Sequence, residues 1–160
     1  MQSNRHTVAM PLSLTQATCD RLHNKNIRVM IYCAAAMGLG SYGAKHDISF
    51  PNQIEIKVNG DDLKSNFKGL KNKPGTTKPA DITDMLRKAP GYNNSIQITY
   101  ALTTKVGYHD NNVLNASLNP FQKYTVVINL VDRRSADSLA TELADTGKRI
   151  SKDYVVKESK

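Results

Sequence analysis

The fold is decided by one stretch of this 160-residue chain, Phe50-Pro51-Asn52-Gln53-Ile54-Glu55-Ile56-Lys57-Val58-Asn59-Gly60. Apolar residues alternate with polar ones from Gln53 to Val58, and a period of two places all the apolar side chains on one face of a β-strand. Pro51 stands where a strand can begin, and Asn59-Gly60 supplies residues that tolerate the positive φ of a turn. The stretch therefore predicts a half-buried strand that contributes Ile54, Ile56 and Val58 to a core.

Length and composition indicate one soluble domain. A chain of 160 residues with 39% hydrophobic and 22% charged residues can bury a core as a single unit. The N-terminus lacks an apolar signal core, and the longest apolar run, near residues 29–39, is shorter than the roughly 20 residues of a membrane span. Cys19 and Cys33 are the only cysteines, which favours a reducing, intracellular compartment over a disulfide framework.

Two patterns that could carry chemistry are weak in this chain. The four histidines are scattered along the sequence and form no ligand cluster with the two cysteines, so we expect no zinc site. Gly38-Leu39-Gly40-Ser41-Tyr42-Gly43 matches G-x-G-x-x-G, which must open a helix in a dinucleotide-binding fold. Here the next residues lead straight into the strand near Ile54, which leaves no room for that helix. The glycine loop of protein kinases joins two strands and fits better, but this chain has no His-Arg-Asp or Asp-Phe-Gly motif. A flexible inter-strand loop is therefore favoured over a nucleotide site.

The remaining residues predict further strands and short helices. Alternating patterns predict strands at 7–12, ending near Pro11, and at 26–36, 95–104 and 123–131. Helices are expected after Ser13 or Thr15, at 83–89 capped by Thr83, and after Ser135 with Leu139 and Leu143 facing inward. An Asn-rich polar excursion is expected at 106–120. These elements predict a mainly β (α+β) fold, either an antiparallel β-sandwich or a distorted β-barrel with two to three short helices.

The net charge of +8 suits an acidic partner, which could be a nucleic acid, an anionic membrane surface or an acidic protein. Residues 61–78 predict a long loop that is the densest basic segment of the chain. The candidate partner contacts on it are Lys64, Phe67, Lys68, Lys71, Lys73 and Lys78. A solvated loop without a partner is the favoured interpretation, because one aromatic side chain is a poor platform for stacking bases.

The strand expected at 123–131 allows a second interpretation. Its segment Val127-Ile128-Asn129-Leu130, followed by Asp132, resembles a motif that docks on ubiquitin-like modifiers by strand addition. A core strand is the favoured interpretation, because an exposed run of this kind would promote aggregation.

Two segments carry a resemblance to a known family. Residues 50–59 place proline-asparagine before a strand that ends Lys-Val-Asn, and Pro79-Ala80-Asp81-Ile82-Thr83 follows later in the chain. Together they resemble the PINIT domain of the SIZ/PIAS class of SUMO E3 ligases, in which the second segment is the pentapeptide Pro-Ile-Asn-Ile-Thr, with Ala80 and Asp81 as departures here. The strand at 124–131 and the Ser-Ala-Asp-Ser-Leu helix after it extend the resemblance over about residues 6–150. The departures and the long Asn-rich excursion indicate a fungal-type branch.

The resemblance implies a single domain over residues 1–160, cut from a longer ligase, with its core at about 6–150. In such ligases a zinc-binding RING-like module, which recruits the SUMO-charged E2, lies C-terminal to this domain. Two cysteines cannot build a zinc site of that kind, so we expect the module to be absent from this chain. We therefore expect no catalytic site, no metal and no cofactor here.

The function implied by the resemblance is substrate recognition and localisation: a nuclear monomer that holds a nuclear target protein near the E2. Pro79, Asp81, Ile82 and Thr83 are assigned to structure, and the basic loop to partner contact. A basic nucleic-acid-binding module, with DNA as its partner, is the alternative function. No membrane partner is expected.

Overall fold

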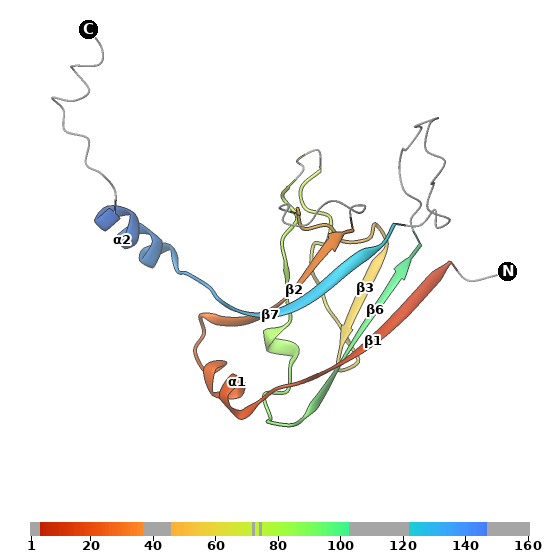
Figure 1. The fold of residues 1–160 in the computed structure, drawn as a ribbon, viewed down its shortest axis with the longest axis horizontal. Helices are drawn as coiled ribbons and strands as arrows, with labels where there is room; N and C mark the ends of the chain where they lie inside the picture. Colours follow the sequence, from red (N-terminus) through yellow and green to blue (C-terminus); the bar gives the residue numbers. More distant parts are fainter. Residues whose placement is uncertain (1–3, 37–45, 72, 74, 103–121, 147–160) are drawn as a thin grey trace, which may run out of the picture.

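Two antiparallel sheets packed face to face form the body of the protein (Figure 1). The computed structural model describes residues 4–36, 46–71, 73, 75–102 and 122–146. One sheet has the strand order β1-β6-β3-β4 and the other β5-β2-β7. The predicted mainly β fold is confirmed, and the sandwich is the correct alternative, because within the described residues no strand pairing joins the two sheets into a barrel.

The larger sheet consists of β1 (Arg5–Ser13), β6 (Asn93–Ala101), β3 (Ile54–Val58) and the short β4 (Asp61–Asp62). The smaller sheet consists of β5 (Ala80–Asp81), β2 (Ile27–Ala35) and β7 (Tyr124–Asp132). The helical segments are α1 (Gln16–Arg21), the 3₁₀ turn η1 (Thr83–Met85) and α2 (Ala136–Thr146). No helix of the described residues is long and apolar enough to cross a membrane.

Strand β3 has the alternation that its sequence predicts. Ile56 and Val58 are buried, whereas Glu55 and Lys57 are exposed. The strand begins at Ile54 and not at the proline, and it ends in a two-residue turn. Asn59 and Gly60 have φ values of 54° and 96°, the positive values that a tight hairpin between β3 and β4 requires. The predicted strand and turn are confirmed.

The core lies between the sheets. Strand β2 presents one buried row of side chains, and β3 and β6 present the facing row, as their period of two requires. The buried hydrophobic residues are Leu14, Cys19, Leu22, Ile27, Val29, Ile31, Cys33, Phe50, Ile56, Val58, Ala80, Ile82, Leu86, Ile96 and Ile98.

Strand β1 continues through Pro11, where the sequence predicts its end. Leu102 N–H donates to Asn4 O, which fixes the phase of the ladder: even-numbered residues of β1 bond to β6, and odd-numbered ones face away from it. Pro11 is odd-numbered, so its missing N–H lies at the outer edge of the sheet and costs no ladder bond. The predicted strand end is wrong for this reason.

Helix α1 is confirmed, with Thr15 as its cap: Thr18 N–H donates to Thr15 Oγ1 over 3.2 Å. The predicted helix at 83–89 is wrong, because only η1 forms and Leu86 is already extended with ψ 138°. The side chain of Asn94 bonds both the N–H and the C=O of Arg87, the backbone groups that a longer helix would use.

Helix α2 has the predicted cap, since Ser138 N–H donates to Ser135 Oγ over 3.0 Å. Its leucines do not face inward: Leu139 is 43% exposed and Leu143 is 70% exposed. The helix stands away from the sheets (Figure 1), so no described element covers these side chains. Residues 38–43, 106–120 and 147–160, on which further predictions fall, lie outside the described residues.

Candidate functional site

The basic loop, residues 63–78 between β4 and β5, is held by its own hydrogen bonds. Asn66 Oδ1 accepts from Lys68 N–H over 3.0 Å. Thr76 Oγ1 accepts from Leu70 N–H over 2.8 Å and donates to Lys73 O over 2.7 Å. Gly69 has a φ of +70°, and a Cβ there would lie 2.7 Å from Thr76 Oγ1. The loop therefore has a defined conformation that requires glycine at this position.

The basic loop presents its charges to solvent. All of its predicted contact lysines are exposed: Lys64, Lys68, Lys71, Lys73 and Lys78. Across the described part of the chain, none of these ammonium groups lies within an ion pair. Their charge is therefore available to an acidic partner.

Phe67 is the exception among the predicted contacts, because its ring points inward. It is half-buried and packs edge-on against Phe50, with ring centroids 5.1 Å apart and planes at 61°. Phe50 is itself 6% exposed and belongs to the core. The aromatic contact anchors the basic loop to the sandwich, and it leaves Phe67 only partly exposed to a partner.

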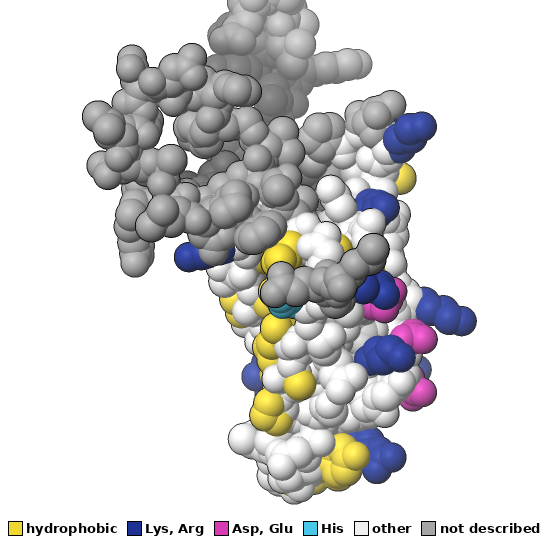
Figure 2. Space-filling view, turned by 90° about the vertical axis from the view of Figure 1, so that its right-hand side faces the viewer, with side chains coloured by type: hydrophobic (Ala, Val, Ile, Leu, Met, Phe, Trp, Pro, Cys, Tyr) yellow, Lys and Arg dark blue, Asp and Glu magenta, His cyan; other side chains and the backbone are white. Residues whose placement is uncertain are grey.

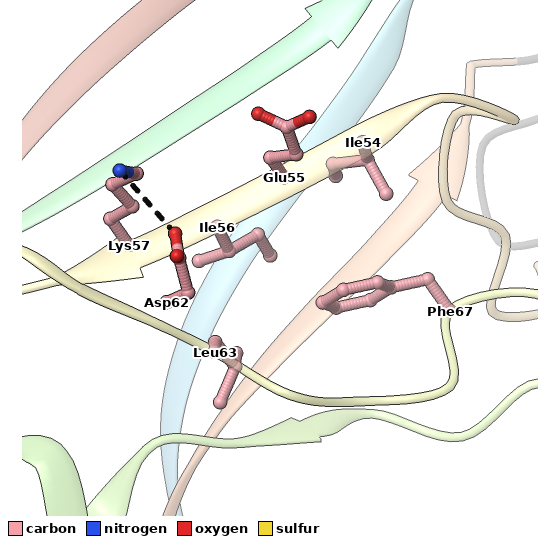
Figure 3. Close-up of a pocket in the computed structure, with 7 residues that line it drawn as sticks. All are labelled: Ile54, Glu55, Ile56, Lys57, Asp62, Leu63 and Phe67. Carbon is pink, nitrogen blue, oxygen red and sulfur yellow. Dashed lines mark ion pairs between the residues drawn. The ribbon is translucent and has the colours of Figure 1, made fainter.

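A hollow of about 420 Å³ lies between β3 and the start of the basic loop (Figure 3). Leu63 and Phe67 extend toward it from the loop, and the Lys57–Asp62 ion pair, with 3.4 Å between Nζ and Oδ1, lies at one end. Its lining residues are Ile54, Glu55, Ile56, Lys57, Asp62, Leu63 and Phe67. This set can receive a side chain of a partner, but it holds no Ser, Thr, Cys or His nucleophile beside a base.

The pentapeptide region forms a closed polar network instead of an open site. Thr83 is 1% exposed, and its Oγ1 accepts from Val29 N–H over 2.8 Å while it donates to Asp81 Oδ1 over 2.6 Å. Arg28 Nε donates to Asp81 Oδ2 over 2.8 Å, and its Nη2 donates to Asp84 Oδ2 over 2.8 Å. Thr83 does not cap a helix as predicted; it joins β5 and η1 to β2.

This network shifts the acidity of its charged members. Partial burial alone would raise the pKa of Asp81, but hydrogen bonds from the side chain and backbone of Thr83 and from Arg28 outweigh it and hold that pKa below its usual value. The pKa of Arg28 is raised by its hydrogen bonds to Asp81 and Asp84. Both groups are therefore charged at neutral pH. Ile82, 0% exposed, and the half-buried Pro79 complete the segment.

A second buried network, centred on Asn94, has no counterpart among the sequence predictions. Asn94 is 0% exposed; its Nδ2 donates to Leu12 O and Arg87 O, and its Oδ1 accepts from Arg87 N–H and from Asn59 Nδ2. One side chain thus joins β1, the segment after η1 and the β3–β4 turn. One sequence feature could have predicted this network: Asn94 stands at an inward position of its strand, on the same face as Ile96 and Ile98. Asparagine is depleted in strands, so an asparagine there indicates a specific polar role.

The two cysteines lie in the core and have the environment of structural, unreactive thiols. Cys19 and Cys33 are both buried and unpaired, and burial raises the pKa of Cys33 to about 11. A thiol with this pKa is protonated at neutral pH. Among the described residues, no three His, Cys, Asp or Glu side chains gather as a metal site would need.

Comparison with known proteins identifies the family. The PINIT domain family matches residues 1–132. E3 SUMO-protein ligase SIZ1 of Saccharomyces cerevisiae is 39% identical over 94 residues, which are 58% of this chain and 10% of that protein. E3 SUMO-protein ligase pli1 of Schizosaccharomyces pombe is 28% identical over 158 residues, 98% of this chain and 19% of that protein.

The fold is shared with solved ligase structures. The crystal structure of S. cerevisiae SUMO E3 ligase SIZ1 superimposes with a TM-score of 0.69 at 25% identity, covering 94% of this chain and 48% of that one. SIZ2 of the same yeast has the same fold, with a TM-score of 0.63 at 23% identity over 87% of this chain and 47% of that one. The chain spans no more than a fifth of the curated relatives' length. Through the match over residues 1–132, the chain belongs to the PINIT domain family.

Proposed function

We propose that this chain is the substrate-recognition and localising domain of a SUMO E3 ligase, and that it holds a nuclear target protein near the SUMO-charged E2. The observation that carries the proposal is the basic loop. Hydrogen bonds hold its described residues, and its lysines are exposed and form no ion pair with any other described residue, on a domain whose relatives are named E3 SUMO-protein ligases. The exposed lysines of this loop can bind an acidic region of another protein.

The proposed mechanism is tethering. A domain that binds the target raises the effective concentration of the acceptor lysine at the E2, which accelerates transfer without any chemistry in the domain itself. In this proposal a zinc-binding RING-like module elsewhere in the parent ligase recruits the E2. In this proposal the sandwich would set the orientation in which the bound target protein meets the E2.

DNA is the second candidate partner, since the same lysines could neutralise phosphates. The loop offers little to single-stranded nucleic acid, because Phe67 is its one aromatic side chain and is half-buried against Phe50. A salt titration separates the two partners: binding driven by phosphates must weaken steeply and linearly in log–log form as salt rises. Such a slope for DNA, with no binding to the target protein, would favour the nucleic-acid module.

The decisive experiment deletes this domain from the parent ligase and follows two reactions. Discharge of SUMO from the E2 should persist, whereas modification of the specific target protein should be lost. Loss of discharge itself would refute the division of labour.

Two double variants, each of which lowers the net charge by two, then test the basic loop against lysines elsewhere on the surface. Lys68→Gln with Lys71→Gln should raise the KM for the target, because both side chains lie on the loop and are exposed. Lys25→Gln with Lys88→Gln changes two exposed lysines outside the loop and should leave KM unchanged. Equal effects of the two pairs would show that only overall charge matters.

A further inference from the structure

Strand β7 leaves one edge of the smaller sheet open. Arg133 N–H donates to Asn26 O and Ala36 N–H donates to Lys123 O, so odd-numbered residues of β7 bond to β2. The even-numbered residues therefore point their N–H and C=O groups away from β2. These residues are Tyr124, Val126, Ile128, Leu130 and Asp132, and in the described part of the chain no backbone group opposes them.

The two long edge strands of the sandwich differ in protection. Natural sheets guard their edges with proline, charge or bulges, because an open edge pairs with other chains. Strand β1 carries Pro11 at a position facing its outer edge. Strand β7 has neither proline nor an inward charge over Tyr124–Val131, and five of those eight residues are β-branched. Its edge is thus both open and suited to pairing.

The core is incomplete beside this edge. The inward side chains of β7 are only half-buried, whereas their partners on β2, such as Ile31 and Cys33, are buried. A groove of about 540 Å³, within the size range of ligand pockets, lies between the inner faces of β1 and β7. It is lined by Val8, Met10, Cys33, Pro51, Ile54, Ile98, Tyr100, Leu102, Gln122, Lys123, Tyr124 and Val126. Figure 2 shows hydrophobic side chains in a band along the side of the molecule where β1 lies.

From the open edge and the adjoining groove together, we propose that β7 binds an extended segment of the target protein, which adds as a further strand to the smaller sheet. Alternate side chains of this segment are apolar and fill the groove, and an acidic residue at one end meets Lys123. Strand addition supplies affinity through main-chain hydrogen bonds, and the side-chain row that enters the groove supplies specificity.

Charge decides the choice of occupant. Of the described residues that line the groove, Lys123 is the one that carries a charge, so an acidic residue on the incoming segment is complementary to it. A second copy of this chain would suit the edge poorly. Two β7 strands paired antiparallel in full register would set Lys123 opposite Arg133 at both ends, and each copy carries a net charge of +8.

This inference rests on the proposed function, which it deepens by naming the class of target segment. The two can fail separately. Peptide binding is measured on the present chain alone, whereas target selection is measured in the parent ligase. Without peptide binding, a loss of target modification on deletion would still support substrate recognition by another surface.

The test measures fluorescence polarisation of a labelled peptide, Asp-Asp-Val-Thr-Ile-Thr-Val-Thr-Gly, titrated with the whole 160-residue chain. A second peptide has serine in place of valine and isoleucine. Two further peptides keep every side chain but are N-methylated at alternate residues, each in one of the two possible phases, so that one of the two cannot donate to the edge of β7. Val8→Glu places a carboxylate in the groove at a side chain that is 46% exposed, and Leu70→Glu is the matched control on a 59% exposed leucine outside it.

We expect saturable binding of the first peptide, and loss of binding with the serine peptide and with one phase of N-methylation. Val8→Glu should weaken binding by about tenfold or more, because the complex would bury an unpaired carboxylate beside apolar side chains. Leu70→Glu should leave it unchanged.

Three results would overturn the proposal. The first is no binding up to about 1 mM protein, or binding that survives both phases of N-methylation. The second is self-association in sedimentation that Val8→Glu abolishes, which would assign the groove to a second copy. The third is binding that appears only when residues 104–120 are replaced by a glycine-serine linker, which would make this segment the occupant.

Discussion

Replacing Thr83 by valine tests the polar network that joins the pentapeptide to β2. Valine has nearly the size of threonine and replaces its hydroxyl group with a methyl group. Thr83 is 1% exposed, and its hydroxyl group accepts from Val29 N–H and donates to Asp81 Oδ1. The buried Val29 N–H would be left without a partner, at a cost of about 1–3 kcal/mol, and a hydrogen bond to a carboxylate, worth about 1.5–3 kcal/mol, would be lost.

These two contributions share one hydroxyl group and are not additive, so we expect Thr83→Val to lower the free energy of unfolding by about 3 kcal/mol. A capping threonine would cost only about 1 kcal/mol. For a domain of this size, a loss of 3 kcal/mol corresponds to a fall in Tm of about 6–12 °C. Thr83→Ser keeps the hydroxyl group and should lose only about 1 kcal/mol for the buried methyl group.

Urea unfolding followed by circular dichroism measures these differences, provided that the m-value stays constant. Thr125→Val is the control, because Thr125 is exposed on β7 and the same change there should fall within about 0.5 kcal/mol of wild type. If Thr83→Val behaved like Thr125→Val, the hydroxyl group would not hold β5 and η1 to β2.

Three further predictions concern the Asn94 network, Asp81 and the basic loop. Asn94→Leu should destabilise by about 2–4 kcal/mol in urea unfolding, because it leaves buried backbone groups of Arg87 unpaired; a loss under about 0.5 kcal/mol would contradict this. Because the pKa of Asp81 is lower in the folded state, its stabilisation is complete above the unfolded pKa and disappears as pH falls through the folded value. Asp81→Asn should therefore lose less stability than wild type between about pH 5 and pH 2, and parallel curves would oppose this. Gly69→Ala should speed tryptic cleavage in the basic loop and leave Tm nearly unchanged, since its Cβ meets Thr76 and its φ is positive; an unchanged cleavage rate would show that the loop accommodates it.

Sequence periodicity predicted the strands well, because each of β2, β3, β6 and β7 has one face toward the core and one toward solvent. The turn at Asn59-Gly60 followed from the same logic, since few residues tolerate its dihedral angles. What periodicity cannot show is which strand lies at an edge. The predicted end of β1 at Pro11 was wrong because proline interrupts a ladder only on the bonded side.

Sequence patterns also failed to predict side-chain hydrogen bonds and contacts between elements that are far apart in the chain. Thr83 has the local pattern of a helix cap, but its hydroxyl oxygen instead accepts a hydrogen bond from Val29 N–H on β2, 54 residues away. Leu139 and Leu143 have the spacing of an inward face, but spacing does not supply an element to cover them. In the basic loop, the lysines are exposed as the sequence suggested, whereas Phe67 is turned inward by its contact with Phe50. Whether these residues contact a partner stays a prediction.

The most direct test of substrate recognition is site-specific photo-crosslinking in the parent ligase during SUMO transfer to its target. A photoreactive residue replaces Lys68 on the basic loop or Val127 on β7, which are both exposed, and Asp20 on α1 serves as the control position. Mass spectrometry should find adducts with the target protein from Lys68, Val127 or both, and none from Asp20. Efficient modification of the target without adducts from either position, or with adducts to the E2 alone, would contradict the proposal that this domain selects the substrate.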